Sequence, residues 1–593
     1  MSSGPASPRE ILQTFVFPYE SAADRVSLYA RWPDGGVSLA DAAGALRVPA
    51  GTTVDFSTFF NSFSHRKWGL LTDIDEVRLE VTGNGRARIV IAAIDVHGAA
   101  LPVAEQIRTL DLYDEPIVVT GIRSIPGAML SVSVTAQDGD VRLERMAWTT
   151  SRPAERRVAV AVVITTFRRE RAARQAMGKF VATIIPGSPR ADIHLYVVDN
   201  GRSLEASQSD RVTLIPNPNL GGAGGFARGL LEARDSGRYT HVLFMDDDAD
   251  CEPESVWRTA ALAAYLKDAR AAVSGAMLYT ETPTVQHEKG AVFRHSGSFD
   301  KFLEALHNGR DLATAGAVAS NDGADEANYG AWWFFAFPLA AVRTLPFPFF
   351  VRGDDIDFGV ANGFPVVTLN GIAAWSGGFD GKRTPATEYL SVRAMLALTL
   401  LHGDRRAARR IFRRARRGAV NFGLRLDYAS MQAVLEAIEM VARGPRAFAH
   451  EPPPLETLGR LNALRSAETM SGADFDGLYT PRPPRGWRAL ASRMLAGGYL
   501  RGRERGERLP YAPIADDMPK WSLLAHDRVA YGAGRDILVM KRSRRRMFAL
   551  WGRALRLALT LGWQLPRLGR AYKDEADACR SEAYWRARFT ADS

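Results

Sequence analysis

The alternation of apolar and polar residues in the first part of the chain is typical of strands with one buried face. Val77–Val81 and Ala87–Ile91 both alternate in this way, and Gly83–Gly85 between them predicts a turn. Leu130–Ala136 and Val141–Ala147 repeat the pattern on either side of a polar turn. Short strands at regular spacing predict an all-β sandwich or barrel for this part.

The pattern then changes to continuous apolar runs, which predict strands buried on both faces of a parallel sheet. The runs are Val158–Ile164, Ile193–Val198 and His241–Met245, and helical stretches separate them. Strands that alternate with helices favour an open α/β sheet, whose ligands bind beyond the carboxyl ends of the strands. Thr165, Asp199 and Asp246 follow the three runs directly. We therefore expect a ligand site at this edge of the sheet.

Beyond about residue 385 the apolar residues recur at helical spacing, with arginines between them. A chain of 593 residues divides into several domains, because single cores stop growing near roughly 250–300 residues. The predicted domains are a β-sandwich domain at 1–152, an α/β domain at 153–385 and a mainly helical domain at 386–593.

The formal net charge is +10, and the excess arginine lies mostly at 405–417 and 541–546. Solvated helix faces are one interpretation, and an anionic membrane surface or anionic polymer is the other. Nucleic acid is not expected, because no nucleic-acid-binding motif is present. Two cysteines give no disulfide framework, which fits a reducing compartment. Without a secretory signal or an apolar run of about 20 residues, a soluble cytoplasmic protein is predicted, peripheral on the inner face of the cell membrane.

The triplet Asp246–Asp248 is the strongest local candidate for chemistry. Three successive carboxylates repel one another and favour protonation unless a cation is present. Oxygen ligands suit Mg²⁺ or Mn²⁺, which commonly also bind substrate phosphates. Alternate residues at a strand end project the same way, so Asp246 and Asp248 are the expected metal ligands. An exposed acidic turn is the alternative.

Three further segments carry candidate functional residues. Leu220–Gly229 is rich in glycine, which permits close backbone approach to a phosphate or sugar, although it is neither a Walker loop nor a dinucleotide fingerprint. A second acidic cluster, Asp354-Asp355, is placed to supply a base for an acceptor hydroxyl. The pair Trp332-Trp333 fits a sugar platform, with core packing as the commoner role. The cluster Phe56–Trp68 is expected to be core or domain interface.

The order of these motifs resembles that of the bacterial galactofuranosyltransferases that build mycobacterial cell-wall galactan, especially the polymerising type. The matching segments are the strand-end TTF, the VVD strand, NPNLGGxGGF, FMDDD, WWF and GDD. Phe56–Phe63 with Trp68, and Glu388-Tyr389 with Arg393, resemble the family as well. The resemblance therefore spans most of the chain.

The resemblance implies a GT-A catalytic domain that transfers galactofuranose from UDP-galactofuranose to a glycan or lipid-linked glycan, with inversion. Asp246 and Asp248 would hold Mn²⁺ or Mg²⁺, Asp355 would be the general base, and Asp354 would position the acceptor. Trp332 and Trp333 would line the sugar site. The residues expected around the nucleotide are Thr165, Phe167, Asp199, Asn219, Gly221, Gly222 and Asp247. Members of the family can self-assemble into rings, so the resemblance also implies that this chain can form a homo-oligomer.

One position departs from the family pattern. The family has a metal-binding histidine after the segment that ends at Trp375, whereas this chain has Ser376. Serine is a poorer ligand for a divalent cation than imidazole. Water, Asp380 or another residue would replace it, or the metal is held less tightly. Another donor, such as a rhamnose nucleotide, and a non-catalytic glycan- or nucleotide-binding paralogue are the alternatives that this departure leaves open.

Overall fold

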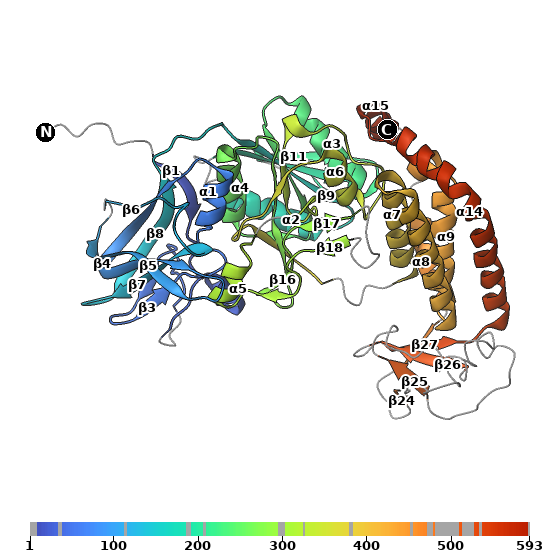
Figure 1. Ribbon diagram of the computed structural model, residues 1–593, viewed down its shortest axis with the longest axis horizontal. Helices are drawn as coiled ribbons and strands as arrows, with labels where there is room; N and C mark the ends of the chain where they lie inside the picture. The colour runs from blue at the N-terminus through green and yellow to red at the C-terminus, as the bar shows by residue number, and fades with distance from the viewer. Residues whose placement is uncertain are drawn as a thin grey trace.

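A strand-rich N-terminal part, a central α/β part and a helix-rich C-terminal part lie in sequence along the long axis of the molecule (Figure 1). The computed structural model describes residues 9–33, 38–111, 115–184, 191–205, 209–294, 303–323, 326–378, 384–450, 455–465, 467–470, 478–480, 509–512, 527–532 and 537–590.

The N-terminal part contains eight strands in one sheet, ordered β1-β8-β4-β7-β3, with β2 on β8 and with β5 and β6 on β4. Its strands are β1 (Glu10–Thr14), β2 (Leu46–Val48), β3 (Thr53–Asp55), β4 (Glu76–Ile94), β5 (Ala100–Leu110), β6 (Ile117–Thr120), β7 (Met129–Ala136) and β8 (Val141–Thr150). A 3-10 helix, η1 (Glu20–Leu28), and α1 (His65–Leu71) complete this part. The predicted all-β content is present, while closure into a sandwich or barrel stays a prediction.

The turn predicted at Gly83–Gly85 is wrong, because β4 runs through it without a break. The first half of β4 pairs with β8 and the second half with β7, and the register shifts between Thr82 and Gly83. A Cβ at Gly83 would lie 2.1 Å from the carbonyl oxygen of Arg142, and Gly85 has a φ of 105°. The glycines therefore allow an irregularity within a long strand, where the sequence pattern was read as a hairpin.

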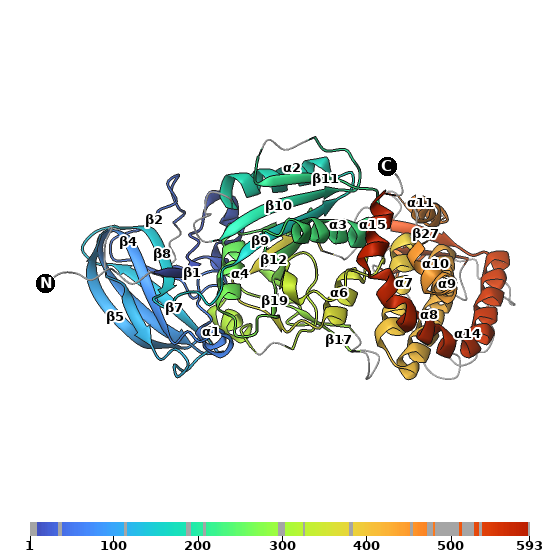
Figure 2. The same ribbon diagram turned by 90° about the horizontal axis from the view of Figure 1, so that it is seen from above.

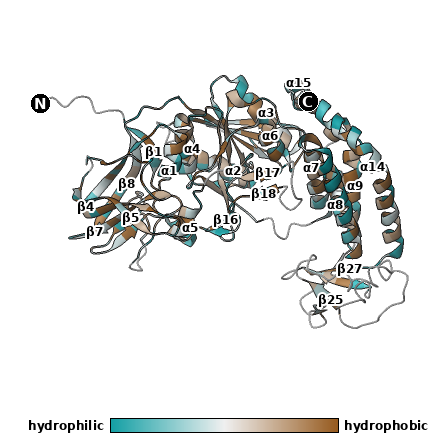
Figure 3. Cartoon of the chain, viewed as in Figure 1, coloured by the Kyte–Doolittle hydropathy of each residue, from teal (hydrophilic) through white to brown (hydrophobic). Residues whose placement is uncertain are grey.

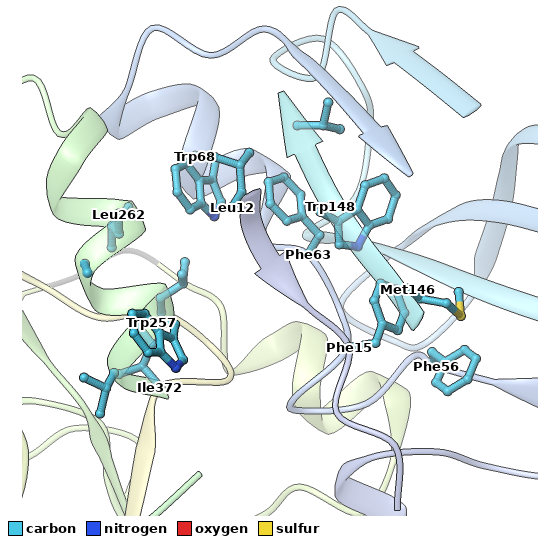
Figure 4. Close-up of a cluster of buried hydrophobic side chains, with 14 of the residues drawn as sticks. Leu12, Phe15, Phe56, Phe63, Trp68, Met146, Trp148, Trp257, Leu262 and Ile372 are labelled. Carbon is cyan, nitrogen blue, oxygen red and sulfur yellow. The ribbon is translucent and has the colours of Figure 1, made fainter. Parts of the chain in front are cut away.

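The aromatic cluster is confirmed as core and domain interface. Phe56, Phe59, Phe60, Phe63 and Trp68 are all 1% exposed or less. The core that Phe56, Phe63 and Trp68 join continues through α4 (Pro253–Tyr265) of the central part, where Trp257 and Leu262 lie beside the N-terminal strands (Figure 4). Phe59 and Phe60 join a second core with Trp375 of the central part. The N-terminal and central parts thus share apolar packing.

The central sheet has seven strands in the order β11-β10-β9-β12-β20-β14-β21. They are β9 (Ala159–Thr166), β10 (Asp192–Asp199), β11 (Val212–Pro216), β12 (His241–Asp246), β14 (Ala272–Ser274), β20 (Phe335–Pro338) and β21 (Val366–Val367). The three predicted buried strands are β9, β10 and β12, which are parallel neighbours (Figure 2). Strand β20 is antiparallel to β12, so the sheet is mixed and the α/β prediction is confirmed.

Helices and a second sheet surround the central strands. The helices are α2 (Glu170–Lys179), η2 (Phe180–Ile184), α3 (Gly221–Asp235), α5 (Ala315–Ser320), η5 (Leu339–Ala341) and α6 (Asp354–Asn362). The second sheet, in the order β13-β22-β15-β16-β19, contains β13 (Asp250–Cys251), β15 (Ala276–Tyr279), β16 (Val285–Glu288), β19 (Arg310–Asp311) and β22 (Ala373–Ser376). Strands β17 (Ala291–Phe293) and β18 (Leu303–Ala305) form a separate pair.

The C-terminal part is helical at both ends and has a small sheet between them. Its helices are α7 (Pro385–His402), α8 (Arg405–Leu424), α9 (Tyr428–Ala442), α10 (Pro445–His450), α11 (Leu455–Ala463), α14 (Arg544–Cys579) and α15 (Glu582–Thr590). The sheet contains β23 (Ala467–Met470), β24 (Leu478–Tyr479), β25 (Leu509–Ala512), β26 (Arg528–Tyr531) and β27 (Ile537–Lys541). The sequence pattern does not predict these strands, because they are short and lie far apart in the chain.

No helix in the described ranges is both long enough and apolar enough to cross a membrane.

Candidate active site

A cavity of about 970 Å³ lies beyond the carboxyl ends of β9 and β12, where the sequence predicted a ligand site. Four elements bring functional groups to its wall: the end of β12, the first turn of α3, the first turn of α6 and the end of β16. Helices α7 and α11 of the C-terminal part line its rim. The predicted residues that line it are Thr165, Phe167, Asn219, Gly221, Gly222, Asp246, Asp247, Trp332, Trp333, Asp354 and Asp355.

The glycine-rich segment lets α3 sit directly against the end of β9. A Cβ at Gly225 would lie 2.1 Å from Thr165 Oγ1, which already accepts a hydrogen bond of 3.0 Å from Asn200 Nδ2. Gly221 has a φ of 70°, and a Cβ there would lie 2.1 Å from the carbonyl oxygen of Phe350. Bulkier residues would push α3 out of this position, so the glycines allow the start of the helix to line the cavity.

Asp199 does not line the cavity, although it follows β10 as predicted. Its carboxylate accepts hydrogen bonds from the backbone N–H groups of Gly201, Ser203 and Leu204 at 2.6–2.8 Å. The side chain therefore shapes the loop after β10. Its predicted place around the nucleotide stays a prediction. Asn219 does line the cavity and accepts a hydrogen bond from Gly221 N at 3.2 Å.

In the acidic triplet, Asp246 ends β12 and Asp247 and Asp248 form the turn that follows; Asp246 and Asp247 are partly buried, whereas Asp248 is exposed. Asp246 and Asp247 line the cavity. The carboxylate of Asp247 accepts hydrogen bonds from Thr166 Oγ1 at 2.7 Å and from Arg169 Nη1 at 2.8 Å. The same Arg169 nitrogen also donates to Asp248 Oδ2 at 2.7 Å. One guanidinium thus neutralises two of the three carboxylates.

Burial and like charge make the carboxyls of the cavity poor acids. Burial, followed by the charges of Asp248, Asp247 and Asp355, raises the pKa of Asp246 to about 7. Burial raises the pKa of Asp355 to about 6, and burial with the adjacent charge of Asp355 raises that of Asp354 well above its usual range. Such shifts in one cavity are typical of functional sites.

The carboxylate oxygens of the acidic triplet are suitable ligands for a divalent cation, but the protein offers few such ligands. In the ranges that the structure describes, no group of three or more His, Cys, Asp or Glu side chains is arranged to hold a metal ion. Strand β13 pairs Asp250 with Trp375, so Ser376 is brought beside the chain that leaves the triplet. Mg²⁺ commonly uses one or two carboxylates and completes its shell with substrate phosphates and water. Asp380, named above as a possible replacement, lies outside the described residues.

Helix α6 presents Asp354 and Asp355 from its first turn. Gly353, with a φ of 88°, precedes the helix, and Asp355 Oδ1 accepts the N–H of Ile356 at 2.8 Å. A Cβ at Gly222 would lie 3.2 Å from Asp354 Oδ2, so the start of α3 approaches that carboxyl closely. The nucleotide side and the acceptor side of the predicted site therefore meet at this point.

Further along α6, Asp357 anchors the helix to the C-terminal part. Asp357 is fully buried and forms a two-pronged ion pair with Arg580, with 3.1 Å between Arg580 Nε and Asp357 Oδ2. His402 Nε2 lies 2.8 Å from Asp357 Oδ1. Burial opposes ionisation, but the charges of Arg580 and His402 outweigh it and lower the pKa of Asp357.

The two tryptophans differ in their surroundings. Trp332 is 5% exposed and packs against Phe226, Phe244 and Phe358, so most of its ring belongs to the core. Its indole N–H has no hydrogen-bond partner among the residues that the structure describes. Trp333 is only partly buried, and its ring meets the edge of His287 at 6.0 Å. Trp333 is therefore the better placed of the two to contact a sugar ring.

Several cavity residues belong to no recognised sequence motif and were not predicted. Arg169 follows β9, and its only signal is proximity to the TTF segment, whose Thr166 ends β9 and also lines the cavity. His287 and Glu288 end β16, and Tyr329 precedes the tryptophan pair. Burial, together with the charge of Asp355, raises the pKa of Glu288 to about 8, so this carboxyl is protonated at neutral pH. No local pattern predicts that β16 reaches this cavity.

Known proteins are similar to this chain over different shares of its length. Residues 12–151 match the family model described as galactofuranosyltransferase 2, N-terminal. Galactofuranosyltransferase GlfT2 of Mycolicibacterium smegmatis is 25% identical over 594 residues, which cover 91% of this chain and 89% of that protein. GlfT2 of Mycobacterium tuberculosis is 25% identical over 584 residues, covering 91% of each. A crystal structure of GalNAc-T7 with UDP, GalNAc and Mn²⁺ aligns with a TM-score of 0.31 at 8% identity, covering 43% of this chain and 49% of that one.

The two GlfT2 relatives support a glycosyltransferase. More particularly, the chain resembles galactofuranosyltransferase GlfT2 along nine-tenths of its length, which confirms the resemblance predicted from the order of the motifs.

Proposed function

We propose that the protein transfers galactofuranose from UDP-galactofuranose to a hydroxyl group of a glycan acceptor, with inversion, through a GT-A catalytic domain. The observation that carries the proposal is one cavity that holds both the glycine-rich start of α3 with the acidic triplet and the Asp354-Asp355 pair. A donor diphosphate and an acceptor hydroxyl need these two kinds of group side by side. The proposed domain boundaries remain 1–152, 153–385 and 386–593.

The donor half of the cavity suits a nucleotide diphosphate. Gly221 and Gly222 at the start of α3 line the cavity, and the positive end of the α3 dipole favours an anion there. Arg169 adds a cation that can exchange its carboxylate partners for phosphate oxygens. Thr165, Phe167 and Asn219 line the same wall. Asp246 and Asp248 would hold Mn²⁺ or Mg²⁺, which when bound supplies positive charge for the departing diphosphate.

Asp355 is the proposed general base. As the acceptor oxygen attacks the anomeric carbon, its proton passes to the Asp355 carboxylate, and the bond from that carbon to the UDP oxygen breaks. A pKa of about 6 leaves Asp355 ionised at neutral pH but more basic than an ordinary aspartate. Asp354, whose pKa burial and the charge of Asp355 raise well above its usual range, would position the acceptor. Unlike glycoside hydrolysis, the reaction needs no acid on the leaving oxygen.

The acceptor half is bounded by Trp333, Tyr329 and the rim of α7 and α11. A partly buried indole offers an apolar face to the C–H groups of a sugar ring. Glu288, protonated at neutral pH, can donate a hydrogen bond to a sugar oxygen. We propose a lipid-linked glycan as the acceptor and a peripheral position on the inner face of the cell membrane.

A donor panel tests the proposal. UDP-galactofuranose, UDP-galactopyranose and a rhamnose nucleotide are each incubated with a galactofuranosyl acceptor, in Mn²⁺ and in EDTA, and nucleotide release is measured. Release with UDP-galactofuranose that falls in EDTA supports the assignment. Release only with another donor would assign the same site to another sugar, and release with none would favour a binding protein.

A further inference from the structure

A second cavity, of about 490 Å³, lies where the N-terminal part meets helix α4 of the central part. Strand β1 and α4 pack side by side there, and both contain hydrophobic residues (Figure 3). The cavity is lined by the chain after β1, the turn at 40–44, part of β8 and the first turns of α4. Among the described residues, none lines both this cavity and the catalytic cavity. Its size and its place between two parts of the chain are typical of ligand sites, which enclose about 300–1,000 Å³.

The inner wall of this second cavity is aromatic. Phe15, Phe17 and Trp257 line it, and each of these side chains is 8% exposed or less. Half-buried Tyr19 completes the wall. The wall therefore offers apolar ring faces together with a phenolic oxygen. This combination suits a sugar ring, which has both C–H faces and hydroxyl groups.

Glu252 gives the second cavity a buried hydrogen-bond acceptor. The residue is 3% exposed, and its Oε1 accepts hydrogen bonds from the phenols of Tyr19, at 2.7 Å, and Tyr29. Within the ranges that the structure describes, its Oε2 accepts none. Because a buried polar atom without a hydrogen-bond partner is unfavourable, a ligand hydroxyl that donates to Oε2 would be bound favourably.

The charges that line the second cavity are nearly balanced. Three of its four carboxylates form ion pairs with arginines: Asp41 and Glu144 with Arg142, and Glu254 with Arg258. Glu252 is the fourth, and exposed Arg145 at the rim forms no ion pair with the described part of the chain. A charged ligand would leave one of these two charges unmatched. A neutral ligand with several hydroxyl groups can instead donate to Glu252 and accept from Arg145.

The second cavity lies close to the donor side of the catalytic cavity. One short segment reaches both, since Asp246 and Asp247 line the catalytic cavity and residues 252–254 line the second one. Glu252 is five residues after Asp247. Even in a fully extended chain, their Cα atoms would lie within about 18 Å of each other.

We propose that the second cavity binds a sugar residue of the glycan whose end is extended in the catalytic cavity. The ring packs on the aromatic wall, a hydroxyl group donates to Glu252 Oε2, and Arg145 donates to another sugar oxygen. The inference rests on the proposed function for the identity of the glycan, which is galactofuranosyl. Because the two cavities are close, a glycan of several sugars occupies both and binds more tightly than a disaccharide.

Two tryptophan substitutions in one turn test the second cavity. Ala42 is exposed and lines the cavity, whereas Ala43, also exposed, is not among its lining residues. Ala42→Trp therefore blocks the cavity, and Ala43→Trp is the matched control. The full chain of each variant is titrated calorimetrically, without donor, with a galactofuranosyl disaccharide and a galactofuranosyl hexasaccharide. We expect the wild type and Ala43→Trp to bind the hexasaccharide at least about tenfold more tightly than the disaccharide, and Ala42→Trp to lose this difference.

A second pair of variants removes a contact and leaves the space open. Arg145→Ala takes away a charge-assisted hydrogen-bond donor and should weaken hexasaccharide binding about tenfold. Arg66→Ala, at an exposed position of α1 outside the cavity, should not change this binding. Glu252 stays intact in all variants, because it also holds the phenols of Tyr19 and Tyr29.

Transfer kinetics separate this inference from the proposed function. Ala42→Trp should raise the ratio of the hexasaccharide KM to the disaccharide KM about tenfold, and Ala43→Trp should leave that ratio unchanged. A wild-type protein that binds the hexasaccharide as expected but transfers no sugar would refute the function and leave the second site standing. Equal hexasaccharide affinity in Ala42→Trp and Ala43→Trp, or no preference for the hexasaccharide in the wild type, would overturn the second site even when sugar is transferred.

Discussion

Replacing Arg580 tests the connection between the C-terminal helices and the helix that carries Asp354 and Asp355. Arg580→Met keeps the volume of the side chain but leaves Asp357 buried without its two-pronged partner. Breaking a buried ion pair by removing one partner costs about 3–5 kcal/mol. His402 still contacts Asp357, at 2.8 Å, so we expect the lower end, about 3 kcal/mol.

The pH dependence gives this prediction its sign. In the wild type the pKa of Asp357 is lower in the folded state than in the unfolded state, so ionised Asp357 stabilises the fold. This contribution to the free energy of unfolding is present above the pKa of an unfolded aspartate and is lost as the pH falls through the pKa of Asp357 in the folded protein. In Arg580→Met burial dominates, Asp357 binds a proton at higher pH, and the variant should lose stability as the pH rises. The change in slope distinguishes a lost ion pair from a simple packing defect.

The assay is denaturant unfolding at several pH values, with kcat and KM measured alongside. Arg586→Met is the matched control, because Arg586 is 47% exposed and pairs with exposed Asp235 and Glu582. Exposed pairs contribute about 0–1 kcal/mol. Equal destabilisation by the two variants, or an unchanged pH slope in Arg580→Met, would refute the anchoring role. Because α6 would shift, we also expect kcat to fall.

Three further predictions concern the cavity. Asp355→Asn should lower kcat by about 10²–10⁴-fold, and wild-type kcat/KM should fall as the pH drops below about 6, where Asp355 binds a proton; full activity in the variant would exclude it as the base. Ser376→His should tighten metal dependence, and an unchanged metal titration would show that position 376 does not face the ion. Gly225→Ala places a methyl group about 2.1 Å from Thr165 Oγ1. It should lower the free energy of unfolding by about 1–3 kcal/mol in a thermal melt and raise the KM for the donor. Gly418→Ala is the control, because a Cβ there has no neighbour within 4 Å, and it should reduce neither stability nor donor affinity.

Continuous apolar runs predicted the central strands well, because a strand buried on both faces must be apolar throughout. The carboxyl ends of β9 and β12 follow from those runs, so the sequence also located Thr165 and Asp246 at one edge of the sheet. The glycine-rich segment could also be predicted from the sequence to allow a close approach of the backbone. The structure explains why glycines are needed there, because α3 lies so close to β9 that a side chain would clash.

Other features depend on contacts that no local pattern encodes. Gly83 resembles a hairpin residue, and only its partner on β8 decides that β4 continues through it. Asp199 and Asp246 look equivalent as strand-end aspartates, yet the carboxylate of Asp199 accepts backbone N–H groups, whereas that of Asp246 lines the cavity. Glu288 lies at the end of β16, in a sheet separate from the central one. The pairing of β16 with the other strands of that sheet, which no local pattern predicts, brings Glu288 to the cavity. Such long-range pairings decide which acidic residues remain available to a ligand.

The central claim is galactofuranosyl transfer at the cavity between α3 and α6. Mass spectrometry of the product formed from UDP-galactofuranose and a galactofuranosyl disaccharide tests it most directly, with Asp355→Asn as the inactive comparison. The account predicts an added hexose in the wild type and almost none in the variant. An unchanged acceptor with wild-type protein, or equal extension by the variant, would contradict it.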